Sequence, residues 1–171
     1  MKNKLFLSAI AVTTALTIQS GQADSSKSEA GLAIASPKTD SLPKAAEWST
    51  DFEAALKKAR ETRRPILLDF TGSDWCGWCM KLDHEVLATP EFKRFAQQHL
   101  VLVKIDFPRH KAQSESERNR NEQLAARFQV PGFPTLVLLD PEARPRGTLS
   151  YAPGGPGPLI ERLASLLANP E

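Results

Sequence analysis

Beyond about residue 45, two patterns of apolar residues take turns along the chain. One pattern predicts strands and the other predicts helices. Short uninterrupted apolar runs at 66–70, 100–105 and 135–139 are typical of buried strands, and a weaker run predicts a fourth strand at 147–151. Apolar residues at helical spacing, together with helix-capping sequences, predict the helices. These are expected at 52–62, 76–87 and 90–98, in a loop that runs into a helix over 109–128, and at 159–167.

The order of these elements predicts an α/β fold. Long helical connections join the strands at 66–70 and 100–105, so these two strands are expected to be parallel. The strands at 135–139 and 147–151 are only a few residues apart and are expected to form an antiparallel hairpin. The chain should therefore fold into a mixed sheet of four to five strands flanked by helices, over residues 47–169.

The N-terminal residues predict export. Basic residues at the start are followed by the mostly apolar, uncharged run Leu5–Ile18, and small residues lie near Ala23. This pattern indicates a signal peptide at 1–23 that is cleaved after about Ala23. The alternative is an uncleaved anchor, although the apolar run is shorter than the roughly 20 residues that span a bilayer. Residues 24–46 are rich in Ser, Ala, Lys and Pro without periodicity, which is typical of a flexible linker.

Removal of the signal peptide changes the charge balance. It takes away Lys2 and Lys4, which reduces the 22 basic residues of the chain to match its 20 acidic ones. A formally neutral protein offers no electrostatic argument for a nucleic-acid partner or for an anionic membrane surface. We therefore expect a periplasmic or secreted protein that does not bind nucleic acid.

The candidate chemistry lies in Trp75-Cys76-Gly77-Trp78-Cys79, which contains the only two cysteines of the 171 residues. A Cys-x-x-Cys pair between a strand and a helix is typical of a two-electron redox site. The partial positive charge at the helix N-terminus favours a thiolate at Cys76, and a thiolate is the species that attacks a disulfide. Cys79, one helical turn later, would then resolve the mixed disulfide, so the chemistry needs no organic cofactor or metal.

Two alternatives for the cysteine pair follow from the same residues. The pair could be an inert disulfide, although a loop of two residues constrains the unfolded chain very little. It could also supply two ligands of a zinc site, which needs two more. The three histidines, His84, His99 and His110, have no spacing typical of such a site, so we assign no metal.

Two stretches of the sequence resemble the thioredoxin superfamily. The first is Asp69-Phe70, followed after four residues by Trp75 to Cys79, and the second is Val130-Pro131-Gly132-Phe133-Pro134-Thr135. The sequence around the cysteines is most similar to that of exported bacterial thioredoxin-like proteins. The resemblance implies a thioredoxin-like fold over nearly all of 47–168 and a cis peptide bond before Pro134, with Pro131 as the competing position.

The resemblance also implies roles for residues near the cysteines. A cis bond would hold the backbone of Phe133 extended beside Cys76, where a substrate strand could pair with it. Asp69 matches the buried carboxylate of thioredoxins and could accept the Cys79 proton. The alternative for Asp69 is a carboxylate that faces water or caps a turn.

The sequence departs from thioredoxins at three points. Gly77-Trp78 replaces Gly-Pro between the cysteines, so the redox poise is not transferable. One extra residue separates Asp69 from Cys76. The lysine that accompanies the buried carboxylate has no counterpart at the expected place, because Leu102 falls there and Lys104 is two residues later.

The flanking tryptophans suggest a surface for substrates. Trp75 and Trp78 could form an apolar platform for flexible protein segments; alternatively, Trp75 packs on the domain and Trp78 alone is exposed. Together with Gly77, Phe133 and Pro134, they are the candidate substrate-binding residues.

These inferences favour an exported thiol–disulfide oxidoreductase that reduces or exchanges disulfides in extracytoplasmic proteins. Its partners would be protein thiols or disulfides and a membrane or soluble redox partner, and we expect a monomer. The sequence leaves open whether the protein works as a reductase, an oxidase or an isomerase. The rival hypothesis is a non-catalytic binding module in which Cys76–Cys79 is a static disulfide.

Overall fold

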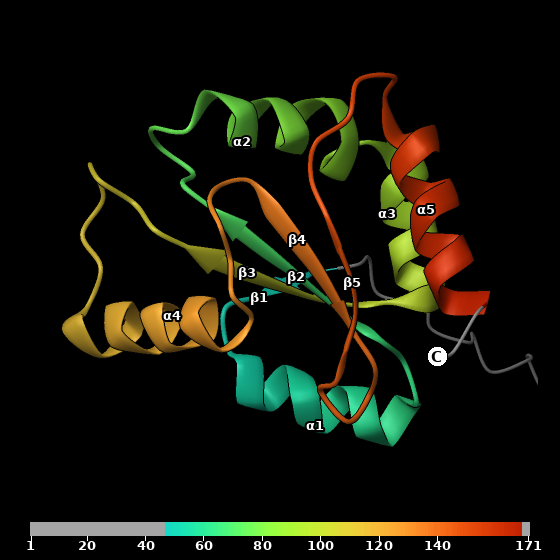
Figure 1. The fold of residues 1–171 in the computed structure, drawn as a ribbon, viewed down its shortest axis with the longest axis horizontal. Coiled ribbons are helices and arrows are strands. Elements are labelled where there is room, and N and C mark those ends of the chain that lie inside the picture. Colours follow the sequence, from blue (N-terminus) through green and yellow to red (C-terminus); the bar gives the residue numbers. More distant parts are fainter. Residues whose placement is uncertain (1–46, 169–171) are drawn as a thin grey trace, which may run out of the picture. The chain divides into compact units, whose positions relative to one another are not determined.

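The computed structural model describes residues 47–168 (Figure 1). The predicted signal peptide (1–23), the predicted linker (24–46) and residues 169–171 lie outside this part. Within 47–168, no helix combines the length and the apolar composition that a membrane span requires.

The sheet has five strands and is mixed, as the sequence predicts. Its order is β1-β3-β2-β4-β5. Strands β1 and β2 run parallel to β3, whereas β4 is antiparallel to both β2 and β5. The bounds are Trp48–Ser49 for β1, Ile66–Thr71 for β2, Val101–Asp106 for β3, Thr135–Leu139 for β4 and Pro145–Leu149 for β5. The pattern missed β1, because a strand of two residues shows no alternation. It also began β5 two residues late, since Pro145 reads as a turn residue but is tolerated at the start of an edge strand.

Helices cover both faces of the sheet (Figure 1). Helices α1 and α4 pack on one face, and α2, α3 and α5 pack on the other. The bounds are Phe52–Thr62 for α1, Gly77–Leu82 for α2, Pro90–His99 for α3, Glu115–Arg127 for α4 and Pro156–Ala168 for α5. The expected helix at 76–87 is not uniform, because α2 continues into a π-helical turn, η1 (Asp83–Leu87).

The central strand β2 is buried along its whole length. Alternate side chains of β2 enter the two apolar clusters: Ile66, Leu68 and Phe70 face α1 and α4, whereas Leu67 faces α2, α3 and α5. Burial on both faces explains why the sequence of this strand is a continuous apolar run and does not alternate. The strand ends at Thr71, directly before the turn that leads to Cys76.

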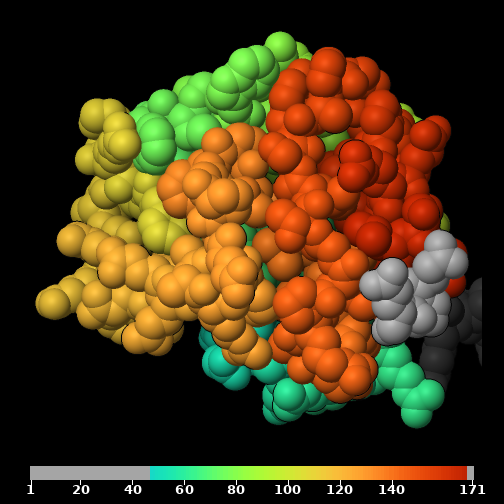
Figure 2. All heavy atoms as spheres, in the orientation of Figure 1, coloured from blue at the N-terminus to red at the C-terminus, as the bar shows by residue number. Residues whose placement is uncertain are grey.

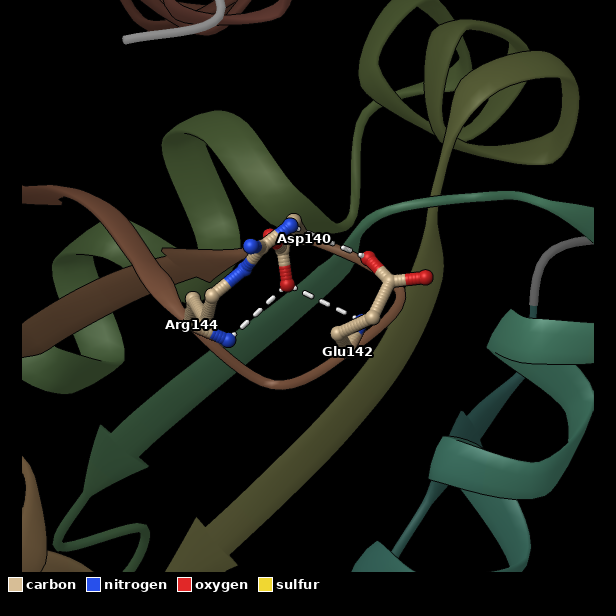
Figure 3. A network of polar contacts seen from close by, with 3 residues as sticks. All are labelled: Asp140, Glu142 and Arg144. Atoms are coloured by element: carbon tan, nitrogen blue, oxygen red, sulfur yellow. Dashed lines mark hydrogen bonds and ion pairs between the residues drawn. The ribbon is translucent and has the colours of Figure 1, made fainter.

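A polar network closes the hairpin between β4 and β5 (Figure 3). Asp140 Oδ1 accepts the backbone N–H groups of Glu142 and Arg144, both at 2.9 Å, and Asp140 Oδ2 accepts Arg144 Nε at 2.6 Å. Burial alone would raise the pKa of Asp140, but the hydrogen bonds from Arg144 and Glu142 hold it below its usual value. Ala143 takes a left-handed backbone with φ of 66°. This turn follows Leu139, which pairs with Ile66, so it lies at the end of β2 away from Cys76.

The hairpin places an edge strand on the surface. Figure 2 shows one face of the molecule, on which the segment from β4 through β5 lies between α4 and α5. The residues that follow β5, including Ser150 and Tyr151, return toward the redox end of the sheet, where Ser150 Oγ donates to the carbonyl oxygen of Pro134 at 3.3 Å.

Candidate active site

Cys76 and Cys79 form a disulfide at the start of α2. Cys76 is the N-cap residue, and its Sγ accepts the backbone N–H of Cys79 at 3.2 Å. The two residues are 7% and 3% exposed, respectively. Both residues are therefore buried, and the sulfur that caps the helix belongs to Cys76.

The turn before Cys76 is packed around Trp75. The backbone N–H groups of Trp75 and Cys76 both donate to the carbonyl oxygen of Gly72. The indole Nε1 of Trp75 donates to the carbonyl oxygen of Phe107 at 2.7 Å, and its ring meets Phe133 edge-on at 6.1 Å between centroids. A Cβ on Gly72 would lie 2.5 Å from the indole, so Trp75 fits here because residue 72 has no side chain.

The last residue of β3 and the loop after this strand make hydrogen bonds to the same turn. Ser73 donates from its backbone N–H and its Oγ to the Asp106 carboxylate, at 2.9 and 2.6 Å. Asp74 accepts three successive backbone N–H groups, those of residues 109–111, at 2.8–2.9 Å. These hydrogen bonds, led by that of Arg109, hold the pKa of Asp74 below its usual range. The guanidinium of Arg109 lies 3.6 Å from the centroid of the Trp75 ring.

The sequence predicted only a loop at the start of 109–128 and gave no indication of this anchor. The missed signal is the Ser73-Asp74 pair, whose short polar side chains are typical of residues that bind nearby backbone groups. The partner loop lies more than thirty residues away in the sequence, so only the β2–β3 pairing reveals it.

The peptide bond between Phe133 and Pro134 is cis, as the resemblance implied, and the bond before Pro131 is not. Phe133 stacks on Phe107 at 4.9 Å between ring centroids. Pro134 is buried next to Thr135, the first residue of β4, which pairs with Phe70 near the end of β2. The antiparallel register thus brings the Phe133–Pro134 loop to the same end of the sheet as the cysteines.

A cavity of about 430 Å³ adjoins the redox helix. Its lining residues come from α2, from the loop before β4 and from the segment after β5: Trp78, Lys81, Phe133, Pro134, Ser150, Tyr151 and Pro153. Trp78 is 60% exposed. Of the two tryptophans, therefore, Trp75 packs on the domain and Trp78 faces solvent, which matches the second of the two alternatives drawn from the sequence. Gly77 is exposed, but it does not line the cavity.

Tyr151, which was not among the residues predicted from the sequence, forms part of one wall of this cavity. Its ring lies 5.6 Å from that of Trp78, and the Lys81 ammonium lies 5.4 and 5.5 Å from the two centroids. The Tyr151 hydroxyl donates to Glu85 Oε2 at 2.6 Å, a hydrogen bond that raises the pKa of Tyr151. Lys81 also lies 3.9 Å from Glu85 Oε1. Tyr151 and Lys81, both linked to Glu85, thus lie beside the Trp78 ring.

Asp69 does not face water, which decides against the alternative of an exposed or turn-capping carboxylate. The residue is 2% exposed, and its Oδ1 has no hydrogen-bond partner. Burial raises the pKa of Asp69 from 3.8 to about 7, while Lys104 lowers it and Asp83 and Asp106 raise it.

The prediction that the buried carboxylate has no lysine at the position expected from thioredoxins was wrong. Lys104 pairs directly with Asp69 in the parallel register of β2 and β3, and Leu102 pairs with Leu67. The register between two strands, and not a count along the chain, decides which residues are neighbours. The Lys104 ammonium lies 3.6 Å from Asp83 Oδ1 at the start of η1.

Comparison with known proteins identifies the family. The sequence model described as thioredoxin-like matches residues 47–141. The chain belongs to the thioredoxin-like family. The disulfide bond reductase DsbH of Chlamydia pneumoniae is 39% identical over 121 residues, which are 71% of this chain and 72% of that protein. The thioredoxin-related protein DsbJ of the same organism is 39% identical over 97 residues, but the match covers 57% of this chain and only 28% of DsbJ.

A solved structure of a DsbH oxidoreductase agrees with this assignment. It superposes with a TM-score of 0.69 at 36% identity, over 79% of this chain and 95% of that one. The thioredoxin-like chain is thus a thiol–disulfide oxidoreductase, and the resemblance drawn from its motifs is confirmed.

We expect Gly72→Ala to displace Trp75 in this thioredoxin-like protein, because the new Cβ would overlap the indole. Overpacking of this kind lowers the free energy of unfolding by roughly 1–3 kcal/mol. Urea denaturation measures that loss, and the indole N–H signal in a 15N NMR spectrum reports the loss of the bond to Phe107. Gly157→Ala is the matched control, since a Cβ there meets nothing within 4 Å. Equal stability of the two variants would contradict the packing argument.

The raised pKa of Asp69 makes the stability of this thioredoxin-like protein depend on pH. Between pH 3.8 and about 7 the folded state keeps a proton that the unfolded state loses, so the contribution of Asp69 to stability falls as pH rises through this window. Asp69→Asn should therefore stabilise the oxidised protein by roughly 3–4 kcal/mol more at pH 8 than at pH 4.

Denaturation curves of wild type and Asp69→Asn at both pH values test this difference. Glu91→Gln, which removes an exposed carboxylate from α3, serves as the control. A stability difference between wild type and Asp69→Asn that is the same at pH 4 and pH 8 would refute the buried, protonated carboxyl group.

Proposed function

We propose that this protein is an exported thiol–disulfide oxidoreductase in which Cys76 is the nucleophile and Cys79 the resolving thiol. The observation that carries the proposal is the Cys76–Cys79 disulfide at the N-terminus of α2, where Cys76 Sγ caps the helix and accepts the backbone N–H of Cys79. A thiolate at Cys76 would accept a hydrogen bond from the Cys79 N–H and would lie at the positive end of the helix. Both interactions favour the charged form of the thiol.

The reductive direction proceeds in two balanced steps. The Cys76 thiolate attacks one sulfur of a substrate disulfide, and the other substrate sulfur leaves as a thiolate. The Cys79 thiol then loses its proton, attacks Cys76 Sγ and releases the second substrate thiolate. The substrate gains two electrons, and the protein ends with the Cys76–Cys79 disulfide that the structure contains.

Asp69 is the proposed acceptor of the Cys79 proton. A proton acceptor works best when its pKa lies near the working pH, and burial brings the pKa of Asp69 to about 7. Its unpartnered Oδ1 is free to take a proton.

The cavity beside Trp78 is the proposed site for the substrate segment around its disulfide. Its walls are largely aromatic and proline side chains, and Trp78 lies partly in solvent. In this proposal the backbone of Phe133 pairs with an extended substrate strand, Pro134 shapes that loop, and Trp75 supports it from below. Gly77, which has open space where a Cβ would be, lets the substrate approach the sulfurs.

The proposed cellular setting rests on the sequence and on a relative. Residues 1–23 would direct export and 24–46 would tether the monomeric domain at 47–169. The name of the disulfide bond reductase DsbH, 39% identical to this chain, favours the reductive direction. Reduction in an oxidising compartment needs a supply of electrons, so we propose a membrane or soluble redox partner in addition to protein disulfides as substrates. Oxidoreductase names among the relatives favour this function over a static binding module.

Single-cysteine variants test the division of labour. Cys79→Ser should trap mixed disulfides with a substrate protein such as insulin, because no resolving thiol remains. Cys76→Ser should abolish dithiothreitol-driven insulin reduction and trap nothing. Non-reducing gels and turbidity measure the two outcomes. Trapping by Cys76→Ser and none by Cys79→Ser would reverse the assigned roles.

A further inference from the structure

Lys104 stands between two carboxylates of different burial. Its backbone on β3 pairs with that of Asp69 on β2. Its ammonium, however, makes its ion pair with Asp83, at 3.6 Å from Oδ1, and lies 5.7 Å from the centroid of the Trp48 ring. Asp69 Oδ1 has no hydrogen-bond partner. Lys104, the cation that acts on the buried Asp69 carboxyl group, is thus engaged by a second carboxylate, that of Asp83.

Asp83 is tied to the redox helix through its backbone. It is the first residue of η1, and its N–H donates to the carbonyl oxygens of Cys79 and Met80. Its side chain is 52% exposed, against 28% for Lys104. The π-helical turn therefore fixes an exposed carboxylate one turn after the resolving cysteine, on the side of the helix that faces Lys104.

The charges around Asp69 come from two elements. Lys104 and Asp106 belong to β3, and Asp83 belongs to η1. Asp106 accepts two hydrogen bonds from Ser73, so Asp83 is the anion that competes for the lysine. An anion close to a buried acid favours its protonated form, and so does the withdrawal of a nearby cation. Asp83 does both.

We propose that Asp83 is a positioning residue for the Asp69–Lys104 pair: it holds the Lys104 ammonium toward the surface and leaves the Asp69 carboxyl group free to exchange a proton with Cys79. The inference rests on the proposed role of Asp69. The proton moves from the Cys79 thiol to the Asp69 carboxylate as the mixed disulfide resolves, and it returns when the Cys76–Cys79 disulfide is reduced again.

Carboxyl 13C NMR of the oxidised protein tests the geometry without any substrate. Asp83→Asn should lower the titration midpoint of Asp69 by about half a pH unit or more, and Lys104→Met should raise it. In the Lys104→Met background, Asp83→Asn should cause less than half of that shift, because no cation remains to be released. Asp83→Glu should restore the wild-type midpoint, and the control Glu91→Gln should leave it unchanged.

Two NMR results would overturn the inference. No shift in Asp83→Asn would show that Asp83 does not control the pair. An equal shift with and without Lys104 would show that Asp83 acts as a distant charge and does not position the lysine.

The pH profile of insulin reduction separates this inference from the function on which it rests. Asp83→Asn should shift the profile to lower pH, and Asp69→Asn should remove the corresponding inflection. If Asp69→Asn leaves the profile unchanged, the proton-transfer role of Asp69 fails and the inference fails with it. If Asp69→Asn removes the inflection but Asp83→Asn matches wild type, the proposed function stands and only the role of Asp83 is refuted.

Discussion

The antiparallel pairing of β4 with β2 is the constraint on which the site depends. Because β4 runs against β2, its first residue, Thr135, pairs with Phe70, and the Phe133–Pro134 loop meets the end of β2 from which the chain turns to Cys76. The two motifs are more than fifty residues apart in the sequence, and this register brings them to one edge of the sheet. The aromatic contacts of Phe133 with Trp75 and Phe107 then join the two turns.

The same strand creates the electrostatic character of the site. Since β2 is covered by helices on both faces, a carboxylate in its middle cannot reach water, and Asp69 is buried with one oxygen unpartnered. The positive charge that offsets the Asp69 carboxylate comes from Lys104 on the neighbouring strand, and Lys104 also forms an ion pair with Asp83. A buried acid with an incompletely committed cation is costly for stability, and such groups gather at functional sites.

Local chemistry and the directions of two strand pairs were predictable from the sequence, whereas the register of the strands was not. Apolar runs revealed the strands β2, β3 and β4, a Thr-Pro-Glu sequence marked the start of α3, and two cysteines at the start of a helix marked the redox site. The family motif implied the cis bond before Pro134. The role of Lys104, the Asp74 anchor and the wall at Tyr151 depend on strand register or on contacts between distant segments, which leave no periodic signal. The π-helical turn was missed because Leu82, Val86 and Leu87 fit an ordinary helix equally well.

The reduction potential of the Cys76–Cys79 pair tests the central claim most directly. The protein is equilibrated at pH 7 in glutathione or dithiothreitol buffers, and the oxidised fraction is measured after thiol alkylation. A pair that cycles between dithiol and disulfide should have a midpoint between about −270 mV and about −120 mV, the range between thioredoxin and the strongest periplasmic oxidant. A pair that stays oxidised below about −300 mV would be a structural disulfide, and that result would contradict a redox-active site.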